Sequence, residues 1–112
     1  MKNLINKYHL FLESKQNCFC EVKDSTIMVD KEKLNSLLKD VSFMELKSEY
    51  TRGKFINEIV LNYKELTDDI KDNVKNVLNS LKNVSEFENY FIFDKLNRII
   101  LRFSDSHPMK YK

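Results

Sequence analysis

The chain has 112 residues, of which 42% are hydrophobic and 32% charged, and its formal net charge is +2. This length fits one domain with its own core, and the content of eight Phe and five Tyr excludes a disordered chain. Basic and acidic side chains are mixed along the whole sequence, which disfavours a general attraction to nucleic acid or to an anionic membrane.

Glycine and proline are almost absent, because Gly53 and Pro108 are the only ones. Loops that hold phosphate groups usually contain glycine, since glycine lets the backbone approach a ligand closely at positive φ. The sequence therefore disfavours a nucleotide-binding loop, and we expect no cofactor.

The N-terminal third predicts a helix, a hairpin and a second helix. Apolar residues at helical spacing predict an amphipathic helix over residues 3–15. Two short β-type segments, 19–23 and 26–29, flank a polar two-residue turn and predict a hairpin. Asp30 is expected to cap the next helix, whose apolar stripe begins at Leu34.

Residues 43–63 change from a helical period to an alternating one, which predicts a long hairpin. With Arg52 and Gly53 as its turn, every facing pair joins two apolar or two polar side chains. These pairs are Tyr50 with Phe55, Ser48 with Asn57, Leu46 with Ile59, and Met44 with Leu61. A slip of one residue would destroy this match, so the sequence specifies the register.

A third helix is expected to begin at Thr67, whose hydroxyl can accept a hydrogen bond from an amide of the first turn. Asp68 and Asp69 follow and face the positive end of the helix dipole. Apolar residues at helical spacing continue from Ile70 to Leu81 and give this helix one buried face.

The final predicted hairpin has strands over residues 90–93 and 98–103. A three-residue loop that ends with Asn97 in the left-handed conformation would pair Phe93 with Ile99. The register of this hairpin decides which side chains share a face.

These elements predict one compact α+β domain over residues 1–112, with the order α-ββ-α-ββ-α-ββ. We expect three helices, packed mainly on one face of an antiparallel sheet of four to six strands built from hairpins. Residues 104–112 are expected to be a frayed C-terminal tail.

The two cysteines, Cys18 and Cys20, are too close in the chain for an unstrained disulfide. Free thiols, together with the absence of an apolar leader and of a membrane-spanning run, indicate a cytoplasmic protein. A structural zinc site needs four ligands, and only His9 and His107 could join the thiols, so we expect no metal site. A small enzyme that uses either thiol with His107 is the third functional hypothesis.

Both faces of the final hairpin are apolar, whereas an antiparallel sheet usually shows water a polar face. In the predicted register, one face carries Phe91, Phe93, Ile99, Leu101 and Phe103. The other face is the predicted partner-binding site, which consists of Tyr90, Ile92, Arg98, Ile100 and Arg102. Three interpretations are open for it: a core face covered by helices, a protein-binding face, or a platform for single-stranded nucleic acid.

The leading hypothesis is a small non-enzymatic protein that binds and modulates another macromolecule, in the first place a protein. An inhibitor or immunity-type protein of a low-GC bacterium or phage agrees with the size and with a composition that lacks alanine. The alternative is a nucleic-acid-binding regulator that uses the aromatic and arginine side chains of the final hairpin. A homodimer through the same hairpin is also kept open.

Overall fold

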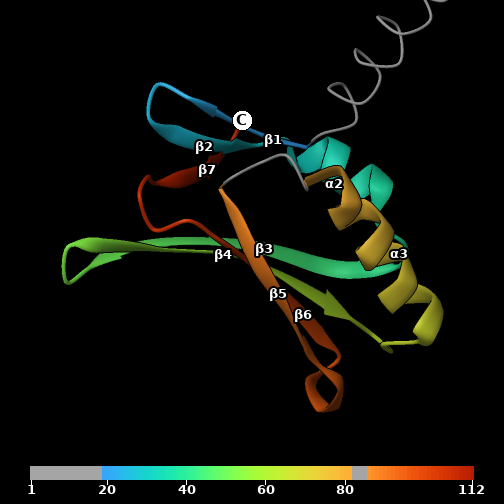
Figure 1. Ribbon diagram of the computed structural model, residues 1–112. Coiled ribbons are helices and arrows are strands. Elements are labelled where there is room, and N and C mark those ends of the chain that lie inside the picture. The colour runs from blue at the N-terminus through green and yellow to red at the C-terminus, as the bar shows by residue number, and fades with distance from the viewer. Residues whose placement is uncertain (1–18, 82–85) are drawn as a thin grey trace, which may run out of the picture.

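The computed structural model describes residues 19–81 and 86–112, which form a mixed α+β domain with two sheets (Figure 1). The helical elements are α2 (Lys31–Leu37), α3 (Asp68–Leu78) and the 3-10 turns η1 (Asn79–Leu81) and η2 (Asp94–Leu96). The strands are β1 (Cys20–Lys23), β2 (Thr26–Val29), β3 (Val41–Thr51), β4 (Lys54–Tyr63), β5 (Phe87–Phe93), β6 (Arg98–Phe103) and β7 (Met109–Tyr111). Three helices were expected, but the described residues contain two α-helices, and the helix expected over residues 3–15 lies outside them.

The first hairpin and the second helix are confirmed. β1 and β2 are antiparallel, and the two residues of their turn have positive φ. The carboxylate of Asp30 accepts a hydrogen bond from the amide of Lys33 at 3.0 Å and so caps α2. Leu34 and Leu38 are buried in the core, which fixes this helix against the sheets.

β7 corrects the predicted frayed tail at residues 104–112. This strand pairs in parallel with β2 and completes a three-stranded sheet with the order β1-β2-β7. Met109 is 2% exposed, and the amide of Ile27 donates to the carbonyl of Pro108 at 2.8 Å. The C-terminal segment is ordered because a strand far earlier in the chain supplies hydrogen-bond partners and a buried site for its apolar side chains.

The β3–β4 hairpin has the predicted register. All the predicted pairs are present, and at the turn the rings of Tyr50 and Phe55 lie 4.9 Å apart. The turn needs a positive φ at both of its residues, and φ is 52° at Arg52 and 80° at Gly53. α3 also begins as predicted, since the hydroxyl of Thr67 accepts from the amide of Ile70 at 3.3 Å.

The β5–β6 hairpin differs from the prediction by one residue. Its loop is η2 followed by Asn97, which does adopt the left-handed conformation, with φ of 50°. This loop is one residue longer than predicted, so Phe93 pairs with Arg98 and not with Ile99. β6 also pairs with β4, which gives a four-stranded antiparallel sheet with the order β3-β4-β6-β5.

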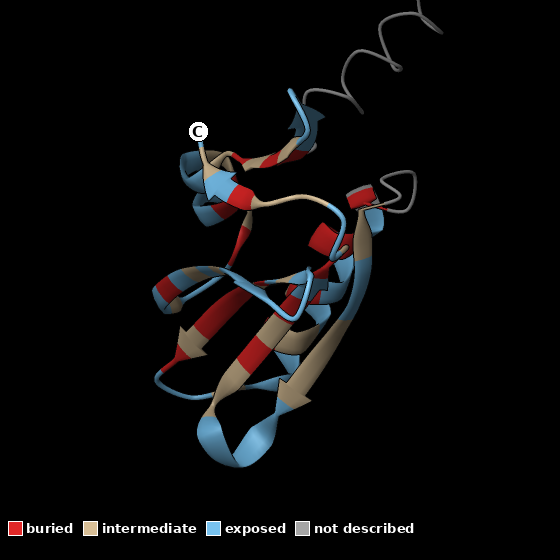
Figure 2. Cartoon of the chain, turned by 90° about the vertical axis from the view of Figure 1, so that its left-hand side faces the viewer, coloured by how far each residue is buried: buried red, intermediate tan, exposed pale blue. Residues whose placement is uncertain are grey.

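A single hydrophobic core lies between the two sheets and the helices. Both helices and the three-stranded sheet lie on one side of the four-stranded sheet (Figure 1). We call the face of the four-stranded sheet toward them the inner face and the opposite one the outer face. Buried and less buried positions alternate along the strands, as the colours of Figure 2 show. Neither described helix is long and apolar enough to cross a membrane.

One buried polar side chain, Asn57 on the inner face, attaches the C-terminal segment to β4. Its amide nitrogen donates to the carbonyls of Ser104 at 2.8 Å and of His107 at 2.6 Å. Its amide oxygen accepts from the hydroxyl of Ser48 at 2.6 Å, and that hydroxyl accepts from the amide of Met109 at 3.0 Å. Ser48 and Asn57, which the sequence predicts as a facing pair in the β3–β4 hairpin, therefore position β7.

Candidate functional site

The register of the β5–β6 hairpin divides the predicted site between two faces. Tyr90 faces Leu101 and Ile92 faces Ile99, and both side chains pack against the core from the inner face. The prediction that Tyr90 and Ile92 share a face with Arg98, Ile100 and Arg102 is therefore wrong. The physical reason is the longer loop, which moves every side chain of β5 to the opposite face.

Phe91 and Phe93 take the positions predicted for Tyr90 and Ile92. Phe91 faces Ile100 and Phe93 faces Arg98, all on the outer face. Phe93 is 42% exposed, and Phe91 is half-buried. A four-residue loop that ends at Asn97 would have predicted this arrangement from the sequence alone.

The strand registers arrange the outer face in rows that run across the four strands. The central row contains three apolar side chains, Val60, Ile100 and Phe91, with Glu45 at its β3 end. Val60 is only 4% exposed although it does not belong to the core cluster. Its neighbours on the same face cover it, so this row is a small apolar centre of its own.

A second row lies toward the loop of the β5–β6 hairpin. It has aromatic side chains at both ends, Phe43 on β3 and Phe93 on β5, and Phe43 is 58% exposed. Between them, the Nε of Arg98 donates to the Oδ1 of Asn62 at 3.0 Å. The exposed aromatic rings therefore lie at the two edges of the face.

The third row is charged and borders the central row on its other side. It consists of Lys47, Glu58, Arg102 and Asn89. The Nη2 of Arg102 lies 3.0 Å from the Oε2 of Glu58, and its Cζ lies 4.8 Å from the centre of the Phe91 ring. Such an exposed ion pair contributes little to stability, but these contacts hold a planar donor group beside the apolar row. We call the three rows together the outer patch.

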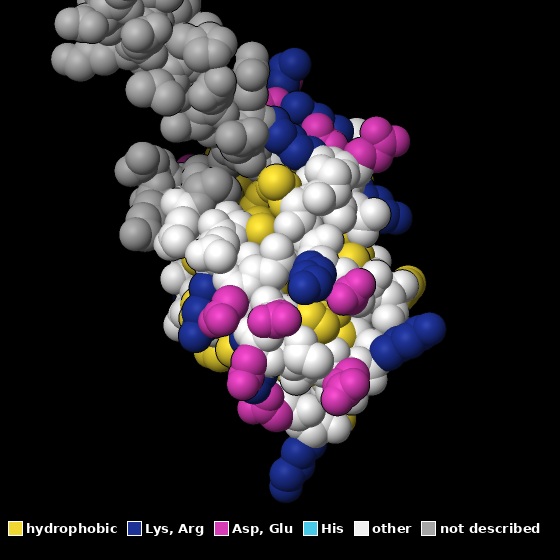
Figure 3. Space-filling view, turned by 90° about the vertical axis from the view of Figure 1, so that its right-hand side faces the viewer, with side chains coloured by type: hydrophobic (Ala, Val, Ile, Leu, Met, Phe, Trp, Pro, Cys, Tyr) yellow, Lys and Arg dark blue, Asp and Glu magenta, His cyan; other side chains and the backbone are white. Residues whose placement is uncertain are grey.

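The side of the molecule where the helices lie has a different surface from the outer patch. Viewed onto the side where the helices lie, Lys and Arg alternate with Asp and Glu, and hydrophobic side chains form only small separate areas (Figure 3). α3 itself is amphipathic: Ile70, Val74, Val77 and Leu78 are buried in the core, and its exposed side is charged and polar. This side is an ordinary solvated face.

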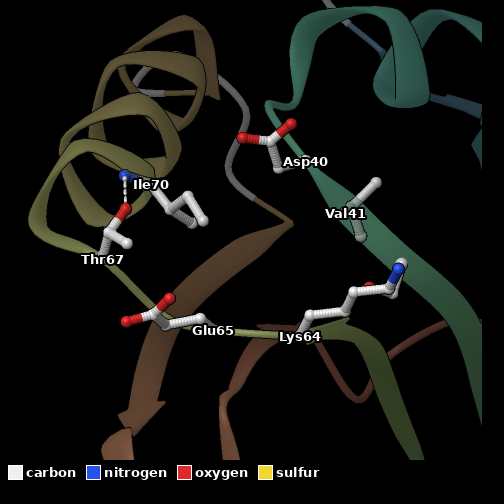
Figure 4. A pocket seen from close by; sticks show the side chains of 7 residues that line it. Asp40, Val41, Lys64, Glu65, Thr67 and Ile70 are labelled. Carbon is white, nitrogen blue, oxygen red and sulfur yellow. Dashed lines mark hydrogen bonds between the residues drawn. The ribbon is translucent and has the colours of Figure 1, made fainter.

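A pocket of about 600 Å³ lies where the start of β3, the β4–α3 connection and the first turn of α3 meet (Figure 4). Its lining residues are Asp40, Val41, Ser42, Lys64, Glu65, Thr67 and Ile70. The charged groups among them are exposed, and the hydroxyl of Thr67 is used as the helix cap. The pocket is thus lined by exposed charged groups and by a hydroxyl that already caps a helix.

The thiol and imidazole considered for catalysis are placed apart. Cys20 is 5% exposed and faces Val29 at one end of β2, whereas His107 precedes the end of β7 that pairs with Ile27. Cys18 and His9 lie outside the described residues. Among residues 19–81 and 86–112, no group of three His, Cys, Asp or Glu side chains could hold a metal ion.

The outer patch is thus the candidate binding surface, because it joins apolar, aromatic and arginine side chains on one sheet face. Sequence reasoning found Arg98, Ile100 and Arg102 and missed the contributions of Val60 and Phe43. The predicted β3–β4 register already places both of these on the face of Lys47 and Glu58, and that was the available signal. Comparison with protein-family models, curated proteins and solved structures finds no match to this chain.

Proposed function

We propose that the chain is a small non-enzymatic protein-binding domain whose partner covers the outer patch. One observation carries this proposal: the apolar row of Val60, Ile100 and Phe91 lies on a sheet face that no described element covers. Sheet faces exposed to water are usually polar. Aromatic and arginine side chains around an apolar centre are typical of protein interfaces.

The charges of the outer patch favour a protein over a nucleic acid. Arg102 already contacts Glu58, and Arg98 already donates to Asn62. Glu45 and Glu58 place negative charge on the same face, where it would repel phosphate groups. A platform for nucleic acid would need basic groups that are free to contact the backbone.

The buried position of Cys20 supports a binding function over a thiol enzyme, because a reactive thiolate needs partial exposure and an electropositive setting. Occupation of the outer patch would let this protein modulate its partner, as expected for an inhibitor or immunity-type protein.

Affinity purification with two charge-reversal variants tests the proposal. Arg102→Glu changes the outer patch, and Lys110→Glu makes the same change of charge on the exposed side of β7. We expect the wild type and Lys110→Glu to retain the same protein in stoichiometric amount, and Arg102→Glu to retain at least tenfold less. Thermal unfolding should show the three Tm values within about 3 °C of one another, because exposed substitutions change stability little.

Two results would contradict the proposal. Equal retention of the partner by Arg102→Glu would place the binding site elsewhere on the molecule. Nucleic acid that survives nuclease and salt washes, with no stoichiometric protein, would favour the regulator instead.

A further inference from the structure

We infer that the partner of the outer patch is a second copy of this chain, bound face to face in a two-fold symmetric dimer. This inference rests on the proposed protein-binding function and names the partner. Its support is the distribution of charged and apolar side chains over the three rows. In one orientation, the outer patch of one copy is complementary to the outer patch of a second copy.

Symmetry limits how two copies of one sheet face can pack. A two-fold axis that relates them must lie in the plane between the sheets, and for aligned sheets it runs close to the strand direction or close to the perpendicular across the strands. An axis along the strands, midway between β4 and β6, places β4 of one copy over β6 of the other and β3 over β5. Each row then lies on the same row of the second copy, in reversed order.

This orientation gives favourable contacts at the two central positions of the apolar and charged rows, and at the ends of the central row it places Glu45 over Phe91 of the second copy. In the central row, Val60 lies over Ile100 of the second copy, so apolar meets apolar. In the charged row, Glu58 lies over Arg102 of the second copy, and the symmetric contact occurs twice. In the aromatic row, the exposed rings of Phe43 and Phe93 come together at the two edges.

An axis across the strands gives the opposite result. It would place Glu45 over Glu45 of the second copy and Arg98 over Arg102, which are repulsive contacts of like charge. The charges of the outer patch therefore select one of the two orientations and disfavour the other. An unrelated partner gives no reason for this self-complementarity.

The size of the face sets the expected affinity. The region shared by all four strands measures roughly 20 by 20 Å, from strand spacings of about 4.8 Å and rises of about 3.3 Å per residue. Two such faces would bury about 800 Å² in total, which is below the size of stable interfaces and close to that of transient ones, so we expect a weak, reversible dimer with a Kd on the order of 100 µM. The sheets would cross at about 30°, so contacts of β4 and β6, which lie nearest the axis, are retained best.

Analytical ultracentrifugation of the full chain, from about 1 to 500 µM, tests the dimer directly. We expect the molar mass to rise with concentration from the 13.4 kDa of one chain toward twice that value. Glu58→Arg and Arg102→Glu should each weaken self-association at least tenfold, whereas Lys110→Glu should behave as the wild type.

Mixing the two patch variants separates contacts between copies from the contact within one chain. In a mixed dimer, the arginine introduced by Glu58→Arg in one chain meets the glutamate introduced by Arg102→Glu in the other. At the symmetric contact the unchanged Arg102 of the first chain meets the unchanged Glu58 of the second, so both contacts between copies are restored. Within each chain the like charges remain. We therefore expect an equimolar mixture to dimerise with nearly the wild-type affinity, although neither variant does so alone.

Where a charge reversal lowers Tm strongly, Phe93→Ser at the exposed edge serves as the second variant, and it too should weaken the dimer. A wild type that remains monomeric at 500 µM overturns the dimer. If Arg102→Glu then still loses a different protein in the affinity purification, the proposed binding function stands without it. A dimer that persists unchanged in all three patch variants, or a mixture that stays monomeric, overturns the assigned interface.

Discussion

The two long hairpins of the four-stranded sheet specify their registers in different ways. In the β3–β4 hairpin the inner face is largely apolar and the outer face carries charged pairs such as Lys47 with Glu58. In the β5–β6 hairpin both faces are apolar, with Ile99 fully buried on one and Ile100 half-buried on the other. A one-residue slip would bury charge in the first hairpin but would exchange similar side chains in the second.

The side chains of the β5–β6 hairpin do not specify its register, and contacts with residues outside the hairpin do. The Oδ1 of Asn97 accepts from the amide of Leu66 at 3.1 Å, and its carbonyl accepts from the amide of Tyr63 at 2.9 Å. These contacts attach the loop to the end of β4. A strand with two apolar faces thus takes its register from its loop and its neighbours.

Two adjacent isoleucines of β6 should differ strongly in how much they contribute to the free energy of unfolding. Ile99→Ala removes a side chain that is 0% exposed and should lower the free energy of unfolding by about 2–4 kcal/mol. Ile100→Ala on the outer face should cost about 1 kcal/mol, since only half-buried contacts are lost. Urea unfolding measures both, and an equal or reversed order would contradict the observed register.

In the β3–β4 hairpin, Asn57→Ala should lower the free energy of unfolding by about 3 kcal/mol. The change removes three hydrogen bonds of a buried side chain and leaves their half-buried partners without it. Asn35→Ala, at an exposed position of α2, is the matched control and should stay within about 0.5 kcal/mol. A loss below about 1 kcal/mol for Asn57→Ala would show that water replaces these partners.

Tyr63 lies at the end of β4, where its amide donates to Asn97 of the β5–β6 loop. Its buried hydroxyl should make the stability of the protein fall at alkaline pH. Burial raises the pKa of its hydroxyl to about 12, and that hydroxyl has no hydrogen-bond partner among the described residues. Between pH 10 and 12 the unfolded chain loses this proton while the folded chain keeps it, so stability falls as pH rises. The loss over this range should be at most about 2 kcal/mol.

Tyr63→Phe is the control for this pH effect. It should remove the extra loss between pH 10 and 12 and leave stability at pH 7 equal or up to about 1 kcal/mol higher. Denaturant unfolding at pH 7, 10 and 11.5 measures it, and an unchanged alkaline loss in Tyr63→Phe would assign that loss to other groups.

The smallest expected effect concerns the turn that sets the β3–β4 register. Arg52 has a positive φ of 52°, which strains a residue with a long side chain. Arg52→Asn should raise the free energy of unfolding by about 0.5 kcal/mol, because Asn tolerates this conformation and Asn-Gly is preferred in such turns. Lys54→Asn, just beyond the turn, is the control and should not raise the free energy of unfolding. An equal rise in Lys54→Asn would show that the positive φ of Arg52 is not the cause.

The sequence predicts those parts of the fold in which local pattern and tertiary environment agree. The caps at Asp30 and Thr67 and the β3–β4 register follow from residues within one element. The β5–β6 register depended on one residue of loop length, because the side chains on both faces are alike. Part of the predicted site, Tyr90 and Ile92, therefore lies on the inner face, and the position of the site on the final hairpin stays a prediction.

The split into two sheets could not be read from local pattern. β7 has only three residues, and its alternation of Met109 and Tyr111 with lysines is too short to distinguish a strand from a tail. Its pairing with β2 depends on Asn57 and Ser48, which lie in a different sheet. Long-range parallel pairing of this kind has no signal within one short segment.

The parallel pairing of β2 with β7 also has a consequence for the order of folding. The segment between β2 and β7 spans residues 30–108, so the loop that their pairing closes is long and its closure is entropically costly. We expect the β3–β4 hairpin to be protected from hydrogen exchange before β2 in pulse-labelled refolding, and simultaneous protection would contradict this order. Until β7 arrives, β2 has an unpaired edge and carries Ile27 and Val29, which are fully buried in the folded protein. A nascent chain on the ribosome would therefore expose an aggregation-prone strand edge until β7 had left the exit tunnel.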